Sequence, residues 1–229
     1  MLLDRIDNDI WIYEGSVVQF FQLPFTTRMT VIRLRDNRLW IHSPEKLNPD
    51  LQAELKYLGE VTYLVSPNKL HHLFLNEWVS AYPNADVFAA PGPPKKRKDI
   101  HFTKVLGNSA EPEWADDIHQ VLFQGSPIME EVVFFHIKSG TLILTDLIEN
   151  FDPQYFTGWR KVAARLSGVL SPNGRTPLDW RLSFLCGKAK ARKSLNTIVR
   201  WNPENIIIAH GKCIMGNGTS FLKKSFSWI

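Results

Sequence analysis

Hydrophobic and polar positions along the first forty residues follow the pattern of short β-strands. Runs rich in β-branched and aromatic residues occupy positions 11–13, 17–22, 29–34 and 38–42. The pair Asp36-Asn37 is a turn signal between the last two runs. The pattern predicts an antiparallel meander at the start of the chain.

Helical and strand signals alternate in the next fifty residues. Asn48-Pro49 marks the start of a helix, whose leucines recur at helical spacing until Gly59 ends it. A buried strand is expected at 61–65, a second helix over 70–78 and another strand at 87–90. This order of elements is typical of parallel strands covered by helices.

After an irregular segment at 91–117, the second half combines a hairpin with longer helices. A strand is expected at 121–123, and a hairpin joins 132–137 to 141–145. Two helices follow, one starting at Asp152-Pro153 and one running from Thr176-Pro177 to about Arg200, with Asp179 in a capping-box position. The first of these helices has one apolar face, which holds Phe156, Trp159, Val162, Leu166 and Val169. A buried strand at 205–209 and a short helix complete the chain.

Length and composition indicate one globular domain over residues 1–229, with 44% hydrophobic and 22% charged residues. No apolar run approaches the ~20 residues that span a bilayer, and the start lacks the apolar stretch of a signal peptide. The two cysteines, Cys186 and Cys213, have no C-x-x-C spacing. We therefore expect a cytoplasmic protein without a membrane partner.

The net charge of +4 is mild and permits anionic partners without requiring them. The basic run Lys95–Lys98 has no interleaved aromatic residues of the kind that stack on bases. A solvated face is the simpler interpretation of this run. Nucleic acid stays a minor candidate, and a small molecule is the expected partner.

Candidate metal ligands follow three of the expected strands. His71 and His72 come after 61–65, Asp146 after 141–145 and His210 after 205–209. Taken singly, each is more often a structural residue than a ligand. Strand ends feeding loops are, however, where α/β folds place their chemistry. Three histidines and one aspartate are sufficient ligands for a zinc or iron ion.

This order of elements and histidines resembles the metallo-β-lactamase-like hydrolases. The resemblance implies an α+β fold, the αββα sandwich, with two mixed β-sheets flanked by helices. More narrowly, segments 66–72, 134–147 and 209–211 resemble an uncharacterised branch of that superfamily, catalogued as a domain of unknown function. The superfamily signature is H-x-H-x-D-H, then G-H-T-x-G, an Asp ending a strand and a late His-Gly, which together hold two metals.

Matching the chain to that signature leaves the first metal position without its histidines. Pro67, Lys69 and Ser126 stand where the superfamily has its three ligands. The second position keeps His72, Asp146 and His210, and it gains His71 where the signature has an Asp. The resemblance therefore implies at most one divalent metal, zinc or iron, bound by His71, His72, Asp146 and His210.

Two functions stay open. The first is a metal-dependent hydrolase with a mononuclear site, acting on an ester, an amide or a phosphoester. The second is a non-catalytic relative, with or without a metal, which uses the site for structure or for ligand binding. Four protein ligands around one zinc ion would close the site, as in structural zinc centres.

His136 stands before a turn but is not expected to be a ligand. A three-residue loop at 138–140 places His136 opposite Leu142 and Asp146 opposite Val132. Four residues of strand, roughly 13 Å, would then separate His136 from the Asp146 level. By spacing, Ser126 is the residue that falls beside the site.

Overall fold

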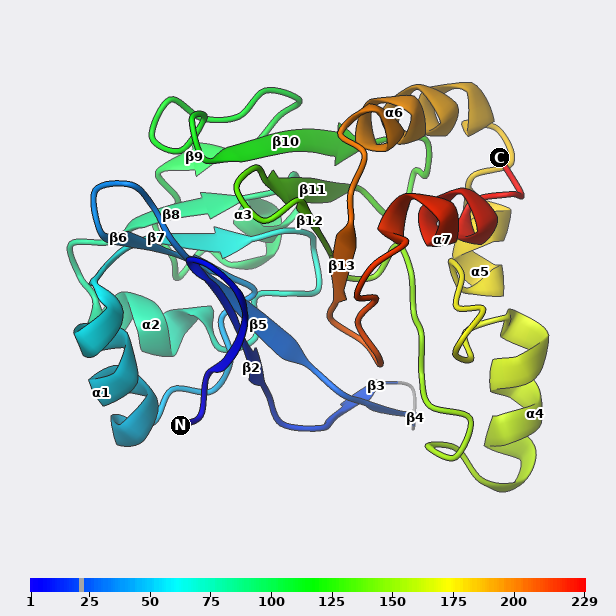
Figure 1. Cartoon of the computed structure of the whole chain (residues 1–229), viewed down its shortest axis with the longest axis horizontal. Helices are drawn as coiled ribbons and strands as arrows, with labels where there is room; N and C mark the ends of the chain where they lie inside the picture. Colours follow the sequence, from blue (N-terminus) through cyan, green and yellow to red (C-terminus); the bar gives the residue numbers. More distant parts are fainter. Residues whose placement is uncertain (21–22) are drawn as a thin grey trace.

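In the computed structural model, which describes residues 1–20 and 23–229, two facing β-sheets lie between two layers of helices (Figure 1). The first sheet has the strand order β1-β2-β5-β6-β7-β8-β9, and the second has the order β10-β11-β12-β13. This is the expected αββα sandwich. Strands β3 (Val18–Phe20) and β4 (Leu23–Phe25) form a separate small hairpin, and residues 21–22 of the expected strand 17–22 lie outside the described residues.

Both sheets are mixed. In the first, the meander is antiparallel through β6, and the strands from β6 to β9 pair in parallel. Its strands are β1 (Asp4–Asp7), β2 (Ile10–Glu14), β5 (Arg28–Arg33), β6 (Arg38–His42), β7 (Glu60–Ser66), β8 (Asp86–Ala89) and β9 (Lys104–Val105). In the second sheet only β12 and β13 are parallel. Its strands are β10 (Ile118–Phe123), β11 (Glu131–His136), β12 (Thr141–Leu144) and β13 (Asn205–Ile208).

Three hydrophobic cores hold the four layers together. The middle core joins the two sheets, with Trp40 of the first packed edge-on against Phe134 of the second. The outer face of the first sheet is covered by α1 (Pro49–Leu58) and α2 (Leu75–Ala81), and that of the second by α6 (Lys188–Arg200) and α7 (Gly218–Ser225). Burial of apolar surface on both faces of each sheet is the main stabilising term of this architecture.

Helix α1 begins and ends where its local signals predict. The Asn48 side chain accepts a hydrogen bond from the Leu51 N–H, and the Gly59 N–H caps the last turn on the Leu55 carbonyl. The second expected helix is shorter than predicted, because residues 70–74 form turns and α2 starts only at Leu75.

Two of the predicted helix boundaries are wrong. Asp152-Pro153 begins a turn, in which the Asp152 carboxylate accepts the Gln154 N–H, and helix α4 (Gly158–Ser167) starts later. The long helix predicted from Thr176 is two helices, α5 (Leu178–Ser183) and α6, and Asp179 makes no cap. The irregular segment 91–117 also contains one helical turn, α3 (Pro93–Lys96).

The register of the β11–β12 hairpin differs by one residue from the prediction. His136 pairs with Thr141, and Phe135 pairs with Leu142. The loop has four residues instead of three, since Gly140 at its end has a φ of 60° and donates its N–H to the Ile137 carbonyl. Continuing this register places Glu131, and not Val132, at the level of Asp146.

The apolar face of α4 does not pack on the core. Trp159, Val162 and Leu166 are 67%, 60% and 73% exposed, and only Ala164 of the helix is buried. Phe156 and Val169, at the two ends of the same pattern, are buried in a small separate cluster. Among residues 1–20 and 23–229, no helix combines the length and apolarity needed to cross a bilayer.

The break between α5 and α6 follows from a close approach of two glycines. A Cβ added to Gly187 would overlap the carbonyl group of Gly125, which precedes β11. Gly187→Ala should therefore lower the free energy of unfolding by about 1–3 kcal/mol, measured by urea denaturation. Gly107→Ala is the control, because no atom lies within 4 Å of its added Cβ. Equal denaturation midpoints for the two variants would contradict this account.

Candidate metal centre

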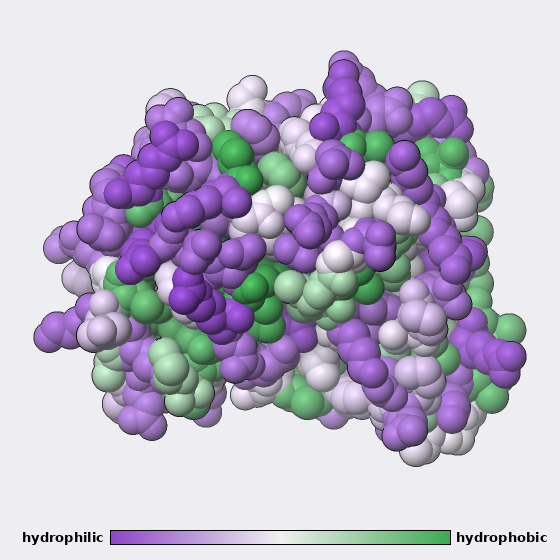
Figure 2. Space-filling model, viewed as in Figure 1, coloured by the Kyte–Doolittle hydropathy of each residue, from purple (hydrophilic) through white to green (hydrophobic). Residues whose placement is uncertain are grey.

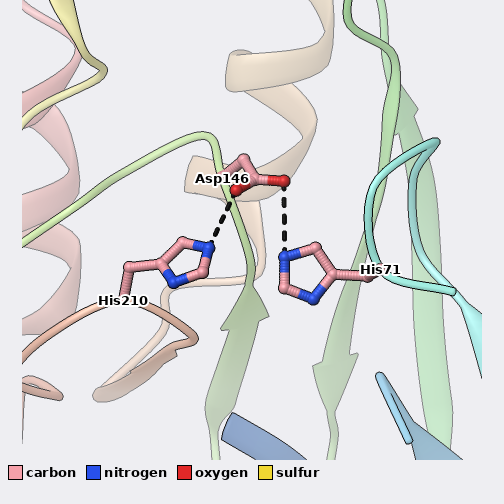
Figure 3. Close-up of side chains that lie close together, drawn as sticks. All are labelled: His71, Asp146 and His210. Carbon is pink, nitrogen blue, oxygen red and sulfur yellow. Dashed lines mark hydrogen bonds and ion pairs between the residues drawn. The ribbon is translucent and has the colours of Figure 1, made fainter. Parts of the chain in front are cut away.

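His71, Asp146 and His210 lie together at one edge of the sandwich, with one ligand atom of each within 4.8 Å of the others. Figure 3 shows the three side chains pointing toward one another from separate segments. Parallel pairing explains two of the three positions. Leu144 of β12 pairs with Ile208 of β13, so the residues two steps further, Asp146 and His210, leave the sheet at the same level. His71 comes from the turn after β7 of the other sheet.

Asp146 is the centre of the cluster. Its Oδ1 lies 2.9 Å from His210 Nε2, and its Oδ2 lies 3.4 Å from His71 Nε2. Burial alone would raise the pKa of Asp146, but the two imidazoles hold it well below its usual range. The carboxylate is therefore ionised in a position that is almost closed to solvent.

Each histidine is oriented by a hydrogen bond on its far nitrogen. His210 Nδ1 lies 2.6 Å from the Thr26 carbonyl oxygen, and His71 Nδ1 lies 2.6 Å from Ser43 Oγ. Because a carbonyl oxygen only accepts, His210 must donate its Nδ1–H to Thr26. In the neutral ring, Nε2 then presents a lone pair to the Asp146 carboxylate. Two lone pairs at 2.9 Å require a cation between them, either a proton or a metal ion.

The donor set fits a divalent metal. Two imidazole nitrogens and one carboxylate oxygen are common zinc ligands, and ligand histidines characteristically donate their second N–H to the protein. Atoms that each lie about 2.0–2.2 Å from a zinc ion are up to about 4 Å apart, so His71 and His210 need only small adjustments around Asp146. Without a metal, the Asp146 carboxylate raises the pKa of His210 to about 9 despite its burial.

A glycine positions the His210 loop. Gly211 has a φ of 97°, and a Cβ added to it would overlap the Asn150 backbone. This close approach lets the Asn150 N–H bond to the His210 carbonyl at 3.0 Å. The segment after β12 is thus joined to the segment after β13, which keeps Asp146 and His210 in contact.

Asn68 and Glu131 hold Asp146 in position through hydrogen bonds to its side chain and its backbone. Asn68 Nδ2 donates to Asp146 Oδ2 at 2.6 Å, and the fully buried Glu131 accepts the N–H groups of Thr145 and Asp146 at 2.8 Å each. Burial and the Asp146 charge raise the pKa of Glu131. Neither residue stands out in the sequence as part of a site. Predicting a four-residue loop between β11 and β12 would have revealed the role of Glu131, because that loop places Glu131 beside Asp146.

The cluster opens into a cavity of about 590 Å³. Apolar side chains form most of its wall, among them Val18, Leu23, Phe25, Phe156, Val169 and Trp180. The cationic residues Lys69, Lys96 and Arg160 also line it. Three further carboxyl groups, those of Glu45, Glu149 and Asp179, line the same space, and burial raises the pKa of Glu45 to about 7 and that of Glu149 to about 8. The cavity therefore contains two carboxyl groups that titrate near neutral pH.

The fourth predicted ligand, His72, is not part of this cluster. It is half-buried and lines the cavity, where burial and the nearby charges of Lys96 and Arg97 lower its pKa. His71, and not its neighbour, therefore occupies the position beside Asp146. Metal binding at this cluster stays a prediction.

Two other expectations concern positions around the site. Ser126 is not among the residues that line the cavity, and its hydroxyl bonds to Ser183 and accepts the Met129 N–H, so its place beside the metal site stays a prediction. His136 lies outside the cluster, with its Nδ1 2.8 Å from the Ser139 hydroxyl. This agrees with the expectation for His136, although the register behind it is shifted by one residue.

The fold defined by these sheets is that of the metallo-β-lactamases. The chain is similar to the DIM-1 metallo-β-lactamase (15% identity, TM-score 0.66, 99% of this chain and 94% of that one) and to a metallo-β-lactamase from Pontibacter korlensis (12%, 0.65, 99% and 97%). It is also similar to the Flv1 flavodiiron core from Synechocystis sp. PCC6803 (12%, 0.67, 99% and 60%). Identities this low show the fold alone.

Within this fold, the chain belongs to the family described as a domain of unknown function, DUF4336, whose profile matches residues 7–167. The matched part contains His71 and Asp146 but ends before His210. No curated protein matches the chain. The description of this family names no activity.

The raised pKa of Glu149 gives a test of the cavity in the metal-free protein. A buried carboxyl with a folded pKa of about 8 and an unfolded value of 4.5 makes the wild type lose stability as the pH rises between these values. Glu149→Gln removes this loss. Its unfolding free energy should match the wild type below pH 4.5 and exceed it by up to about 5 kcal/mol at pH 8, in chemical denaturation.

The exposed Glu113→Gln is the matched control for that series. It should differ from the wild type by less than about 0.5 kcal/mol throughout. A pH-independent difference for Glu149→Gln would show that Glu149 is ionised in the folded protein.

Proposed function

We propose that the protein is a hydrolase that depends on one divalent metal ion, zinc or alternatively iron, bound by His71, Asp146 and His210. The observation that carries this proposal is that the three ligands face a cavity on their open side. Catalytic zinc sites have three protein ligands and one open position, whereas closed four-ligand sites are structural. With His72 outside the cluster, the fourth position is free for water or substrate.

A bound divalent metal would supply Lewis acidity, which polarises a carbonyl or phosphoryl oxygen and activates water near neutral pH. The chain itself supplies orientation. Ser43 and Thr26 hold the two imidazoles, and Asn68 holds the carboxylate of Asp146. Glu149, with a pKa of about 8, is suited to donate a proton to a leaving group and to recover it from water.

The cavity indicates the kind of substrate. Its wall is mainly apolar, so it excludes water and favours a substrate with a hydrocarbon or aromatic part. Lys69, Lys96 and Arg160 favour a negatively charged group at the other end. We propose a small ester, amide or phosphoester that combines these two features. Because Cys186 and Cys213 are both free thiols, we place this activity in a reducing cytoplasm.

A non-catalytic function is the second candidate. It is favoured by the ion pair that Asp146 and a protonated His210 form without any metal. In that case the cavity would bind a ligand, and the cluster would serve only to join the two sheets. Metal-dependent hydrolysis, and not metal content alone, separates the two candidates, because a non-catalytic protein can also hold a metal for structure.

The metal prediction concerns His71 and its neighbour. Purified wild-type protein should hold no more than one zinc or iron ion per chain by elemental analysis, and His71→Ala or Asp146→Ala should abolish it. His72→Ala is the matched control, since it removes the adjacent imidazole without touching the cluster, and it should keep the metal. Loss of metal in His72→Ala alone, or two metals per chain, would contradict the proposed site.

The activity prediction uses p-nitrophenyl esters and bis(p-nitrophenyl) phosphate as substrates. Hydrolysis should stop on chelation, return when zinc is added and be absent from His210→Ala. Glu149→Gln should keep the metal but lower kcat by roughly 100-fold or more and remove the titration of this carboxyl group from the rate profile. Activity that survives both chelation and His210→Ala would refute a metal-dependent mechanism at this site.

A further inference from the structure

Helices α4 and α5 leave a row of large apolar side chains uncovered. We call these residues the α4–α5 face, and its members are Trp159 (67% exposed), Val162 (60%), Leu166 (73%), Leu178 (45%), Leu182 (56%) and Leu185 (62%). In α4, and in α5 (Leu178 and Leu182), the residues recur at intervals of three or four, so they lie on one side of each helix, and Leu185 stands in the turn that follows α5. Helix α4 buries one of its ten residues and α5 buries none.

The two helices form one surface. The Leu178 N–H donates to Ser167 Oγ, and the Arg181 guanidinium donates to the Ser167 carbonyl. Figure 2 shows a mainly hydrophilic surface with several hydrophobic patches, some of them at the right-hand edge, where Figure 1 places α4 and α5. Contiguous exposed apolar residues with a polar border mark interaction sites on otherwise polar proteins.

Positive charge accompanies this face. Residues 158–183 contain five basic residues, Arg160, Lys161, Arg165, Arg175 and Arg181, and one acidic residue, Asp179. Their net charge of +4 equals that of the whole chain, because the rest has 22 basic residues (27 − 5) and 22 acidic residues (23 − 1). The apolar side chains of α4 are therefore accompanied by the exposed basic residues Lys161 and Arg165. Helix α6 is basic as well, with five basic and no acidic residues, but it has no comparable row of exposed apolar side chains.

In contrast to the expectation from the sequence of no membrane partner, we propose that the α4–α5 face docks on the surface of an anionic lipid bilayer. Exposed tryptophan and leucine side chains bordered by arginine and lysine are the composition of helices that lie in the membrane interface. The basic residues attract acidic headgroups, and the apolar residues enter the boundary of the acyl chains. Pairing with a second copy is disfavoured, because it would bring +4 against +4.

The other side of the same helices forms part of the cavity wall. Ala164 and Ser167 of α4 and Trp180 of α5 line the space in front of the His71-Asp146-His210 cluster. Docking therefore places the cavity next to the lipid. If the proposed hydrolase function holds, this favours an amphipathic anionic ester that leaves the bilayer for the cavity. The docking itself depends on no residue of the cluster.

The test is sedimentation of full-length protein with vesicles. Binding is expected to vesicles of mixed phosphatidylcholine and phosphatidylglycerol, to be much weaker with phosphatidylcholine alone and to fall as salt is raised. Lys161→Gln and Arg165→Gln should each weaken binding by about fivefold. Trp159→Ala and Leu166→Ala should each weaken it by about tenfold. These side chains are exposed, so the variants should keep the wild-type circular dichroism and melting temperature.

Matched controls lie on other helices. Tyr57→Ala removes a side chain of α1 that is 90% exposed, and Lys190→Gln and Lys193→Gln remove exposed charges from α6. All three should bind vesicles as the wild type does. Asp146→Ala should also bind, which separates docking from the proposed metal function.

Three results would overturn the docking proposal. One is the absence of sedimentation with anionic vesicles. The second is equal loss of binding in the α1 and α6 controls, which would show a diffuse charge effect. The third is a concentration-dependent dimer, in sedimentation velocity, that is abolished by Trp159→Ala, because it would assign the face to a second copy.

Discussion

The buried negative charge of Asp146 is the constraint on which the site depends. An ionised carboxylate with almost no solvent contact must be compensated by cations and hydrogen-bond donors, or it would take up a proton. The protein supplies two imidazoles and the Asn68 amide, while Glu131 accepts the backbone N–H of Asp146 and holds the residue in place. These partners come from both sheets, so the electrostatic demand of one side chain also fixes how the sheets meet at this edge.

Elements with strong local signals could be predicted from the sequence. Helix α1 follows from Asn48 and Gly59 alone, since capping and termination act within a few residues. The meander and the parallel strands follow from short apolar runs, and the αββα arrangement from their order and the resemblance. For the same reason Asp146 and His210 could be placed together, because parallel strand ends meet at one edge.

The remaining features depend on contacts between distant segments. Whether His71 or His72 faces Asp146 is decided by the turn after β7, in which the Asn68 side chain accepts the His71 N–H. The break between α5 and α6 depends on contact between Gly187 and Gly125. The apolar face of α4 is visible as a pattern, but a pattern alone does not show whether protein or another surface covers it.

The separation of the three cluster residues along the chain has a kinetic and thermodynamic consequence. Asp146 and His210 are 64 positions apart, and His71 comes from the opposite sheet. Contacts between residues this far apart in sequence form only when packing of the sandwich has offset the entropic cost of closing the intervening loops. The centre therefore has no local precursor, and any ligand that binds there binds only the assembled fold. The affinity of such a ligand is then coupled to global unfolding. A bound ligand therefore stabilises the whole protein against unfolding and degradation, and does not merely restrict the motion of one loop.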